Sequence, residues 1–270
     1  MVAPERVAPR LSGLVVYPIK SAGGIALEQS EIDEFGLRYD RRFMVVDQSG
    51  EFLSQRSHAR LALVAPGIEN DVLRVEAPGM PSLELPLAPR PTVATRVTVW
   101  NDTCVATWLG EAAAKWFSDF LGESCSLVYM PADTVRPANP AYDPVGSRVS
   151  FADAFPFLLI SEESLADLNR RLAEPVPMNR FRPNLVVVGA GPYEEDRWKR
   201  IEIGGITLRI VKPCARCLIP TTDQTTAIRS KEPLRTLATY RNVEGKVMFG
   251  QNVVHEGRGR LSVGDQVVLK

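Results

Sequence analysis

Short apolar runs, cut at close intervals by Gly, Pro, Asn and Asp, fill most of the first hundred residues of this chain. The runs are LSGLVVYPIK, SEIDEF, RRFMVVD, VLRVEAP, SLELPL, TVATRVTVW and TCVATW. They are β-branched or alternating, which is typical of strands, and QSGE between RRFMVVD and FLSQR indicates a hairpin turn. A succession of this kind predicts a barrel or a sandwich, and an apolar content of 45% over 270 residues can bury a sizeable core.

Helical periodicity follows these strands. Residues 109–121 repeat apolar side chains at helical spacing, including Trp116, Phe117 and Phe120, and Gly122 is a suitable C-terminal stop. Residues 131–149 are rich in Pro, Asp and Asn and predict a long excursion, of the kind that often forms a functional lid or a linker.

The second half of the chain returns to strands. PFLLI predicts a buried strand that leads into Ser161, an N-cap for a second helix. NLVVVG, RIEIGG and TLRIVK predict strands with a tight hairpin at Gly204-Gly205, and a further short helix is expected from Pro233. The expected fold is therefore mainly β with a few helices, in the α+β class. We divide it into a smaller β-rich unit over residues 1–108 and a larger one over residues 109–270.

The balance of charged residues argues against functions that depend on a strong net charge. Lys plus Arg and Asp plus Glu each number 32, so a formal charge of zero gives no bulk attraction to nucleic acid or acidic membranes. The N-terminus has no apolar run long enough for a signal peptide, and no stretch approaches the roughly 20 apolar residues that cross a bilayer. We expect a soluble, cytoplasmic protein whose anion sites, if present, are local.

The segment KPCARCLIPTTD, residues 212–223, concentrates two thiols, an arginine and two threonines. Structural zinc would need a second ligand pair, and a thioredoxin-type dithiol would need a helix after the motif, where proline and threonine stand instead. Two buried cysteines remain an open alternative, as expected for Cys104 and Cys125. The other alternative is a thiolate ligand to a transition metal, with Arg216 binding an anion beside it.

Anion-binding groups elsewhere favour the last alternative. The junctions between loops and strands carry Tyr-Pro-Ile-Lys-Ser at 17–21, paired arginines at 41–42 and Arg-Phe-Arg-Pro-Asn at 180–184. Gly23-Gly24 would let the backbone approach a ligand closely. Each signal is weak by itself, but together they supply the Lys, Arg and Asn groups that a phosphate-bearing cofactor requires.

Taken together, these motifs resemble a known family. Cys-x-Arg-Cys followed by Thr-Thr-Asp, then Arg-Ser-Lys-Glu-Pro-Leu, with Phe-Arg-Pro-Asn, Tyr-Pro-Ile-Lys-Ser, PFLLISE and the terminal Val-Gly-Asp, is similar in order and spacing to the MOSC proteins that carry an N-terminal β-barrel domain. This is the molybdenum-cofactor family of the mitochondrial amidoxime-reducing component. The resemblance runs from about residue 11 to residue 270. It implies a MOSC N-terminal β-barrel domain over residues 1–108 and a MOSC domain over residues 109–270.

The resemblance implies a pterin dithiolene that chelates molybdenum, with Cys217 as the protein thiolate ligand and Cys214 nearby but not coordinating. The residues implied to hold the pterin and its phosphate are Lys20, Ser21, Arg42, Arg182, Asn184, Ala215 and Arg216. The chain departs from the family pattern at three positions. Ala215 stands where the family relative has a serine, and Ala154 and Phe155 stand where it has Thr and Ser. The last two positions offer no hydroxyl to the cofactor, so backbone groups would have to substitute, or the pocket is reshaped.

The implied reaction is a two-electron reduction that removes oxygen from nitrogen in an N-hydroxylated or amidoxime-like compound, with loss of water. Asp153 is the carboxylate nearest in sequence to a cofactor-facing segment, and we take it as the candidate proton relay, with a turn-capping aspartate as the alternative. The chain has no iron–sulfur cysteine cluster, so a separate electron donor is expected, such as a ferredoxin, a small haem protein or a flavin reductase. Two other functions stay open: a sulfur carrier that uses a cysteine persulfide, and a non-catalytic protein that binds or carries the cofactor.

Overall fold

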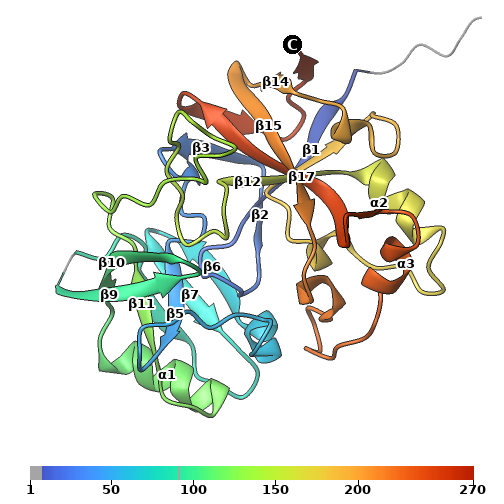
Figure 1. The fold of residues 1–270 in the computed structure, drawn as a ribbon. Coiled ribbons are helices and arrows are strands. Elements are labelled where there is room, and N and C mark those ends of the chain that lie inside the picture. Colours follow the sequence, from blue (N-terminus) through green and yellow to red (C-terminus); the bar gives the residue numbers. More distant parts are fainter. Residues whose placement is uncertain (1–7, 91) are drawn as a thin grey trace, which may run out of the picture.

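The computed structural model describes residues 8–90 and 92–270, and its largest element is a nine-stranded sheet. Its strands follow the order β19 (Val267–Leu269), β14 (Arg200–Ile203), β15 (Ile206–Ala215), β17 (Lys246–Glu256), β12 (Phe157–Ser161), β13 (Leu185–Val188), β1 (Arg10–Val16) and β2 (Ile25–Leu27), with β16 (Asn242–Val243) paired to β17. All neighbours are antiparallel except β12 and β13. The two ends of the chain therefore share one sheet (Figure 1).

A second group of strands comes from the first half of the chain, apart from one strand near the C-terminus (Figure 1). One sheet has the order β5 (Phe43–Asp47), β11 (Cys125–Tyr129), β10 (Asp102–Trp108) and β9 (Val93–Val99). Smaller sheets are formed by β6 (Ala65–Glu69), β7 (Val72–Glu76) and β8 (Leu83–Pro86), and by β18 (Gly259–Ser262), β3 (Gln29–Asp33) and β4 (Gly36–Leu37). The mainly β, α+β class expected from the sequence is confirmed.

Three α-helices are found among the described residues: α1 (Glu111–Leu121), α2 (Glu162–Asn169) and α3 (Leu234–Ala238). In α1, Trp116, Phe117 and Phe120 are buried as the periodicity predicts, and Gly122 ends the helix in the left-handed conformation. The Ser161 side chain caps α2 by accepting from the Ser164 N–H, as predicted. None of these helices is long and apolar enough to cross a bilayer.

Strand pairing crosses the division proposed at residue 108. The strand β11 pairs with β5 and β10, and the buried face of α1 packs into the same apolar cluster as Phe43 and Leu127. In the other direction, β1 and β2 belong to the large sheet. The division after residue 108 stays a prediction. The two units are joined by strand pairing, because β1 and β2 of the first unit belong to the large sheet and β18 of the second unit pairs with β3 of the first.

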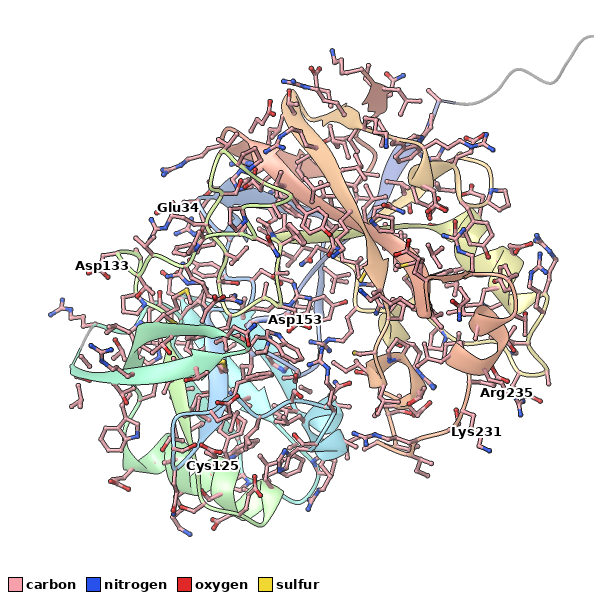
Figure 2. The ribbon with its side chains drawn as sticks, viewed as in Figure 1. Glu34, Cys125, Asp133, Asp153, Lys231 and Arg235 are labelled. Atoms are coloured by element: carbon pink, nitrogen blue, oxygen red, sulfur yellow. The ribbon has the colours of Figure 1, made fainter. Side chains whose placement is uncertain are left out.

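The long excursion between β11 and β12 holds no helix or strand of its own. A buried arginine near the start of the excursion holds the end of the same segment in place. Arg136 donates to the backbone oxygens of Ser150, Ala152 and Asp153 at 2.5 to 3.0 Å, and its Nε contacts the Asp102 carboxylate at 2.8 Å. This arrangement carries Asp153 to the region between the two groups of strands, where Figure 2 labels it.

Candidate functional site

A pocket forms where segments from both halves of the chain meet. The predicted site residues that line it are Lys20, Ser21, Asp153, Arg182, Asn184, Ala215, Arg216 and Cys217. They come from the turn after β1, the end of the long excursion, the entry to β13 and the end of β15. Segments up to almost 200 residues apart in sequence therefore converge as the anion-binding hypothesis requires.

The floor of the pocket contains a buried cation. Lys20 is buried, and its Nζ donates to the Phe151 carbonyl at 2.8 Å and to Asp153 Oδ1 at 2.5 Å. Burial lowers the pKa of Lys20 to about 8, because the charged ammonium loses hydration, although Asp153 opposes the shift. Burial alone would raise the pKa of Asp153, but the charges of Lys20 and Arg56 outweigh it and hold that pKa far below its usual range. Asp153 is therefore ionised at neutral pH.

A buried carboxylate organises one wall. Asp40 accepts from the Tyr17 N–H at 2.9 Å, from Arg41 at 2.5 Å and from Asn184 Nδ2 at 3.0 Å. The Asn184 side chain also donates to the Val15 carbonyl, and its Oδ1 accepts from Arg41 at 3.0 Å. These contacts fix the amide orientation of Asn184 at the entry to β13.

Arg182 lies beside this wall with its guanidinium 4.2 Å from the Tyr17 ring centroid, and its Nη1 donates to the Ala22 carbonyl at 2.5 Å. Burial lowers the pKa of Arg182 to about 10, so the side chain stays charged at neutral pH. Its backbone adopts φ +58°, a left-handed conformation that is uncommon for a residue with a side chain. The chain therefore places a charged group in a dry position with an unusual backbone geometry, which is a frequent feature of binding sites.

The two thiols of the Cys-x-Arg-Cys motif lie at the end of β15. Cys214 and Cys217 both line the pocket and are partly exposed, whereas Cys104 and Cys125 are buried in the core as predicted. Arg216 Nη1 donates to Cys214 Sγ at 3.2 Å, and its Nη2 donates to the Phe181 carbonyl at 2.7 Å. After the motif the chain forms only a short 3₁₀ turn, Ile219–Thr221, so the long helix of a dithiol oxidoreductase does not follow.

Arg42 was predicted to hold the cofactor, and the structure places it elsewhere. It is buried against Phe35 and Tyr129, and its Nε and Nη2 donate to the Met130 carbonyl. Arg41 lines the pocket instead. The two arginines precede β5, and Arg41 adopts φ +49° in the turn before it, so the backbone changes direction between them.

Sequence reasoning also missed Arg56, which enters the pocket from the segment that follows β5. No motif marked it. The Arg56 Nη2 donates to Asp153 Oδ2 at 2.8 Å. Asp40 and Arg136, which hold other site residues in place, were also not singled out from the sequence. No sequence signal distinguished Arg41 from Arg42, because both lie in the turn before β5.

The polar groups of the pocket are suited to an anion. Five cationic side chains face one carboxylate among its described lining residues: Lys20, Arg41, Arg56, Arg182 and Arg216 against Asp153. Arg56 Nη1, Arg182 Nη2 and Arg216 Nε are buried without a hydrogen-bond partner within residues 8–90 and 92–270. Because buried donors are normally satisfied, these three nitrogens indicate a missing acceptor. No cluster of three or more His, Cys, Asp or Glu that could hold a metal ion by itself is found in residues 8–90 and 92–270.

Comparison with known families agrees with this site. The MOSC N-terminal beta barrel domain matches residues 8–124, and the MOSC domain matches residues 146–268. The chain therefore carries both domains of a MOSC protein with an N-terminal β-barrel domain, and it belongs to the MOSC family.

Among its relatives, mitochondrial amidoxime-reducing component 1 is 38% identical in Mus musculus and 35% in Homo sapiens, each over 95% of this chain and 81% of the relative. Molybdenum cofactor sulfurase from Oryza sativa is 32% identical to this chain. The match covers 89% of this chain and 32% of the sulfurase. The family resemblance stated from the motifs is confirmed, and a role connected with the molybdenum cofactor is supported. The predicted cytoplasmic location stays a prediction, since several relatives are named mitochondrial.

Proposed function

We propose that this protein is a molybdenum-cofactor-dependent oxidoreductase that reduces N-hydroxylated or amidoxime-like compounds. The observation that carries the proposal is a pocket lined both by the Cys217 thiol and by three arginines, each of which has a buried nitrogen without a hydrogen-bond partner in the described part of the chain. The names of the mouse and human relatives support the substrate class. When bound, the cofactor would supply a metal that exchanges two electrons with the substrate.

The chain's own groups have distinct roles in this proposal. Cys217 Sγ is the thiolate ligand, which suits a soft donor for a high-valent metal. The cationic and polar groups that hold the pterin and its phosphate are Lys20, Ser21, Arg182, Asn184, Arg216 and the backbone at Ala215. Ala154 and Phe155 line the pocket without offering a hydroxyl, so these two residues contribute no side-chain hydrogen bond there.

The reaction consumes two electrons and two protons. The N–O bond of the substrate breaks, nitrogen is reduced, and the oxygen leaves as water, while a separate electron-donor protein is oxidised. Asp153 is ionised and is poorly suited to give a proton, so its contacts favour a positioning role. Lys20 donates from Nζ to Asp153, and its lowered pKa of about 8 makes it the candidate proton donor of the pocket near neutral pH.

If Lys20 supplies a proton, turnover should fall as pH rises through about 8, because the lowered pKa leaves the amine neutral above that value. The attraction of Asp153 opposes this shift, and Arg136 and Arg56 reinforce it. Asp153→Asn removes the opposing charge and should move the falling limb to lower pH. The turnover number measured between pH 6 and 10 with an artificial reductant tests this, and a flat profile in both proteins would exclude Lys20.

The function itself is tested by elemental and pterin analysis of freshly purified protein, followed by reduction of benzamidoxime with reduced methyl viologen. We expect about one molybdenum and one pterin per chain, with benzamidine as the product. Molybdenum without turnover would instead indicate a non-catalytic carrier. Sulfane sulfur without molybdenum would favour a persulfide sulfur carrier, the candidate supported by the likeness to the rice sulfurase.

A further inference from the structure

Arg56 reaches the pocket from a segment of the N-terminal unit that contacts the second half of the chain through several hydrogen bonds. Gln55 is fully buried, donates to the Ser21 carbonyl at 2.7 Å, and exchanges two amide hydrogen bonds of 3.0 Å with Gln224. The Arg229 guanidinium donates to the carbonyls of Gln55 and Arg56. Residues from the second half of the chain therefore fix the backbone from which Arg56 extends.

The Arg56 guanidinium is held by a hydrogen bond at one edge and by an aromatic ring against its face. Its Nη2 donates to Asp153 Oδ2 at 2.8 Å, and its guanidinium stacks 4.5 Å from the Trp100 ring centroid. The Trp100 indole N–H donates to the other Asp153 oxygen at 3.2 Å, which closes the arrangement. A planar guanidinium held in this way presents its remaining nitrogens in a fixed direction.

The remaining terminal nitrogen, Nη1, is buried and meets no acceptor in hydrogen-bond geometry within the described part of the chain. Arg56 lines the pocket together with Cys217, and a hydrogen bond to that side chain is among the causes that raise the pKa of Arg56. Burial lowers the pKa of Arg56, but attraction to Asp153 and to the Cys217 sulfur more than offsets that effect and raises it. An arginine that served only to join the two units could satisfy itself with Asp153 and water, without burying an unused donor.

We propose that Arg56 is a further binding residue of the cofactor site, which donates from Nη1 to the anionic metal end of the cofactor beside Cys217. This inference rests on the proposed function. It adds Arg56 to Lys20 and Ser21 as groups that the N-terminal unit supplies to the pocket of the Cys-x-Arg-Cys motif. Ala154 and Phe155 line the pocket without hydroxyl donors, and Arg56, which lines the same pocket, supplies a donor.

The test compares Arg56→Gln and Arg56→Lys with Arg60→Gln. Arg60 is the matched control, because it lies on the following 3₁₀ helix, is exposed and stacks on Phe120 away from the pocket. The readouts are molybdenum and pterin per chain, the thiolate-to-metal absorption of the oxidised protein, and the thermal midpoint. Arg56→Gln should lose about tenfold or more of its metal at a nearly unchanged midpoint, as is typical when an outer partner of a metal site is removed.

Arg56→Lys keeps the charge but not the fork of donors, so it should retain part of the metal and shift the absorption band. This variant decides the matter if Arg56→Gln does not fold. Wild-type metal content and an unshifted band in the two Arg56 variants would overturn the inference while leaving the proposed function intact. A wild-type protein that binds no molybdenum would overturn both.

Discussion

Cys217→Ala is expected to abolish the reduction of N-hydroxylated compounds, while Cys214→Ala retains it. The two thiols line the same pocket three residues apart, so general damage to the pocket should affect them alike. Only Cys217 is proposed as a ligand, and Cys214 instead accepts a hydrogen bond from Arg216. Loss of an outer partner typically costs a metal site 10- to 100-fold, and we expect loss of the ligand itself to cost more than about 100-fold in turnover.

The measurements are turnover with a chemical reductant and the thiolate-to-metal absorption of the oxidised protein. Both signals should disappear in Cys217→Ala. Cys214→Ala should keep the band and stay within a few-fold of the wild-type rate. If the two variants lost activity equally with the band intact, the assignment of Cys217 as the ligand would be wrong, and a persulfide mechanism that needs both thiols would gain support.

Asp40→Ala is expected to produce the largest loss of stability of any change near the pocket. Asp40 is buried and accepts hydrogen bonds from Tyr17, Arg41 and Asn184. Its removal leaves the largely buried Arg41 guanidinium without its ionic partner and frees the Asn184 side chain. Breaking a buried ion pair from one side typically costs about 3–5 kcal/mol, and the free energy of unfolding should fall by about that amount.

Urea denaturation followed by tryptophan fluorescence checks this expectation. The matched control is Glu31→Ala, which breaks an ion pair with Arg38 in which both side chains are about half exposed. Surface pairs contribute about 0–1 kcal/mol, so the control should be almost neutral. Equal losses in the two variants would show that Asp40 does not organise the wall. The metal content of Asp40→Ala should fall as well, because Asn184 and Arg41 would no longer be held in place.

Much of the fold follows from local patterns. The periodicity of residues 109–121 and the stop at Gly122 correspond to α1, and Ser161 caps α2 as expected. The Gly204-Gly205 pair joins β14 to β15 with both residues at positive φ, which glycine adopts without strain. These features depend on residues within a few positions of one another, so a sequence displays them directly.

The candidate site was found in outline because its residues cluster in short motifs at the ends of strands. Lys20 with Ser21, Arg182 with Asn184, and residues 214–217 all reach one pocket. Arg42 was misplaced, because the sequence marks two adjacent arginines without saying which faces inward. Arg56 was overlooked, since it belongs to no motif and acquires its setting only from Arg229, Gln224 and Asp153, which lie about 100 to 175 residues away.

By itself, the sequence determined the secondary structure, the family and the short stretches that carry the polar and thiol groups. These properties arise from backbone preferences and residue order, which act over a few positions. The tertiary structure alone decided which guanidinium nitrogens are left without partners, that Lys20 and Arg56 lower the pKa of Asp153 against the effect of burial, and that Arg41 and Arg56 enter the pocket. Burial and long-range contacts set the electrostatics of each group, and they exist only after distant segments have come together.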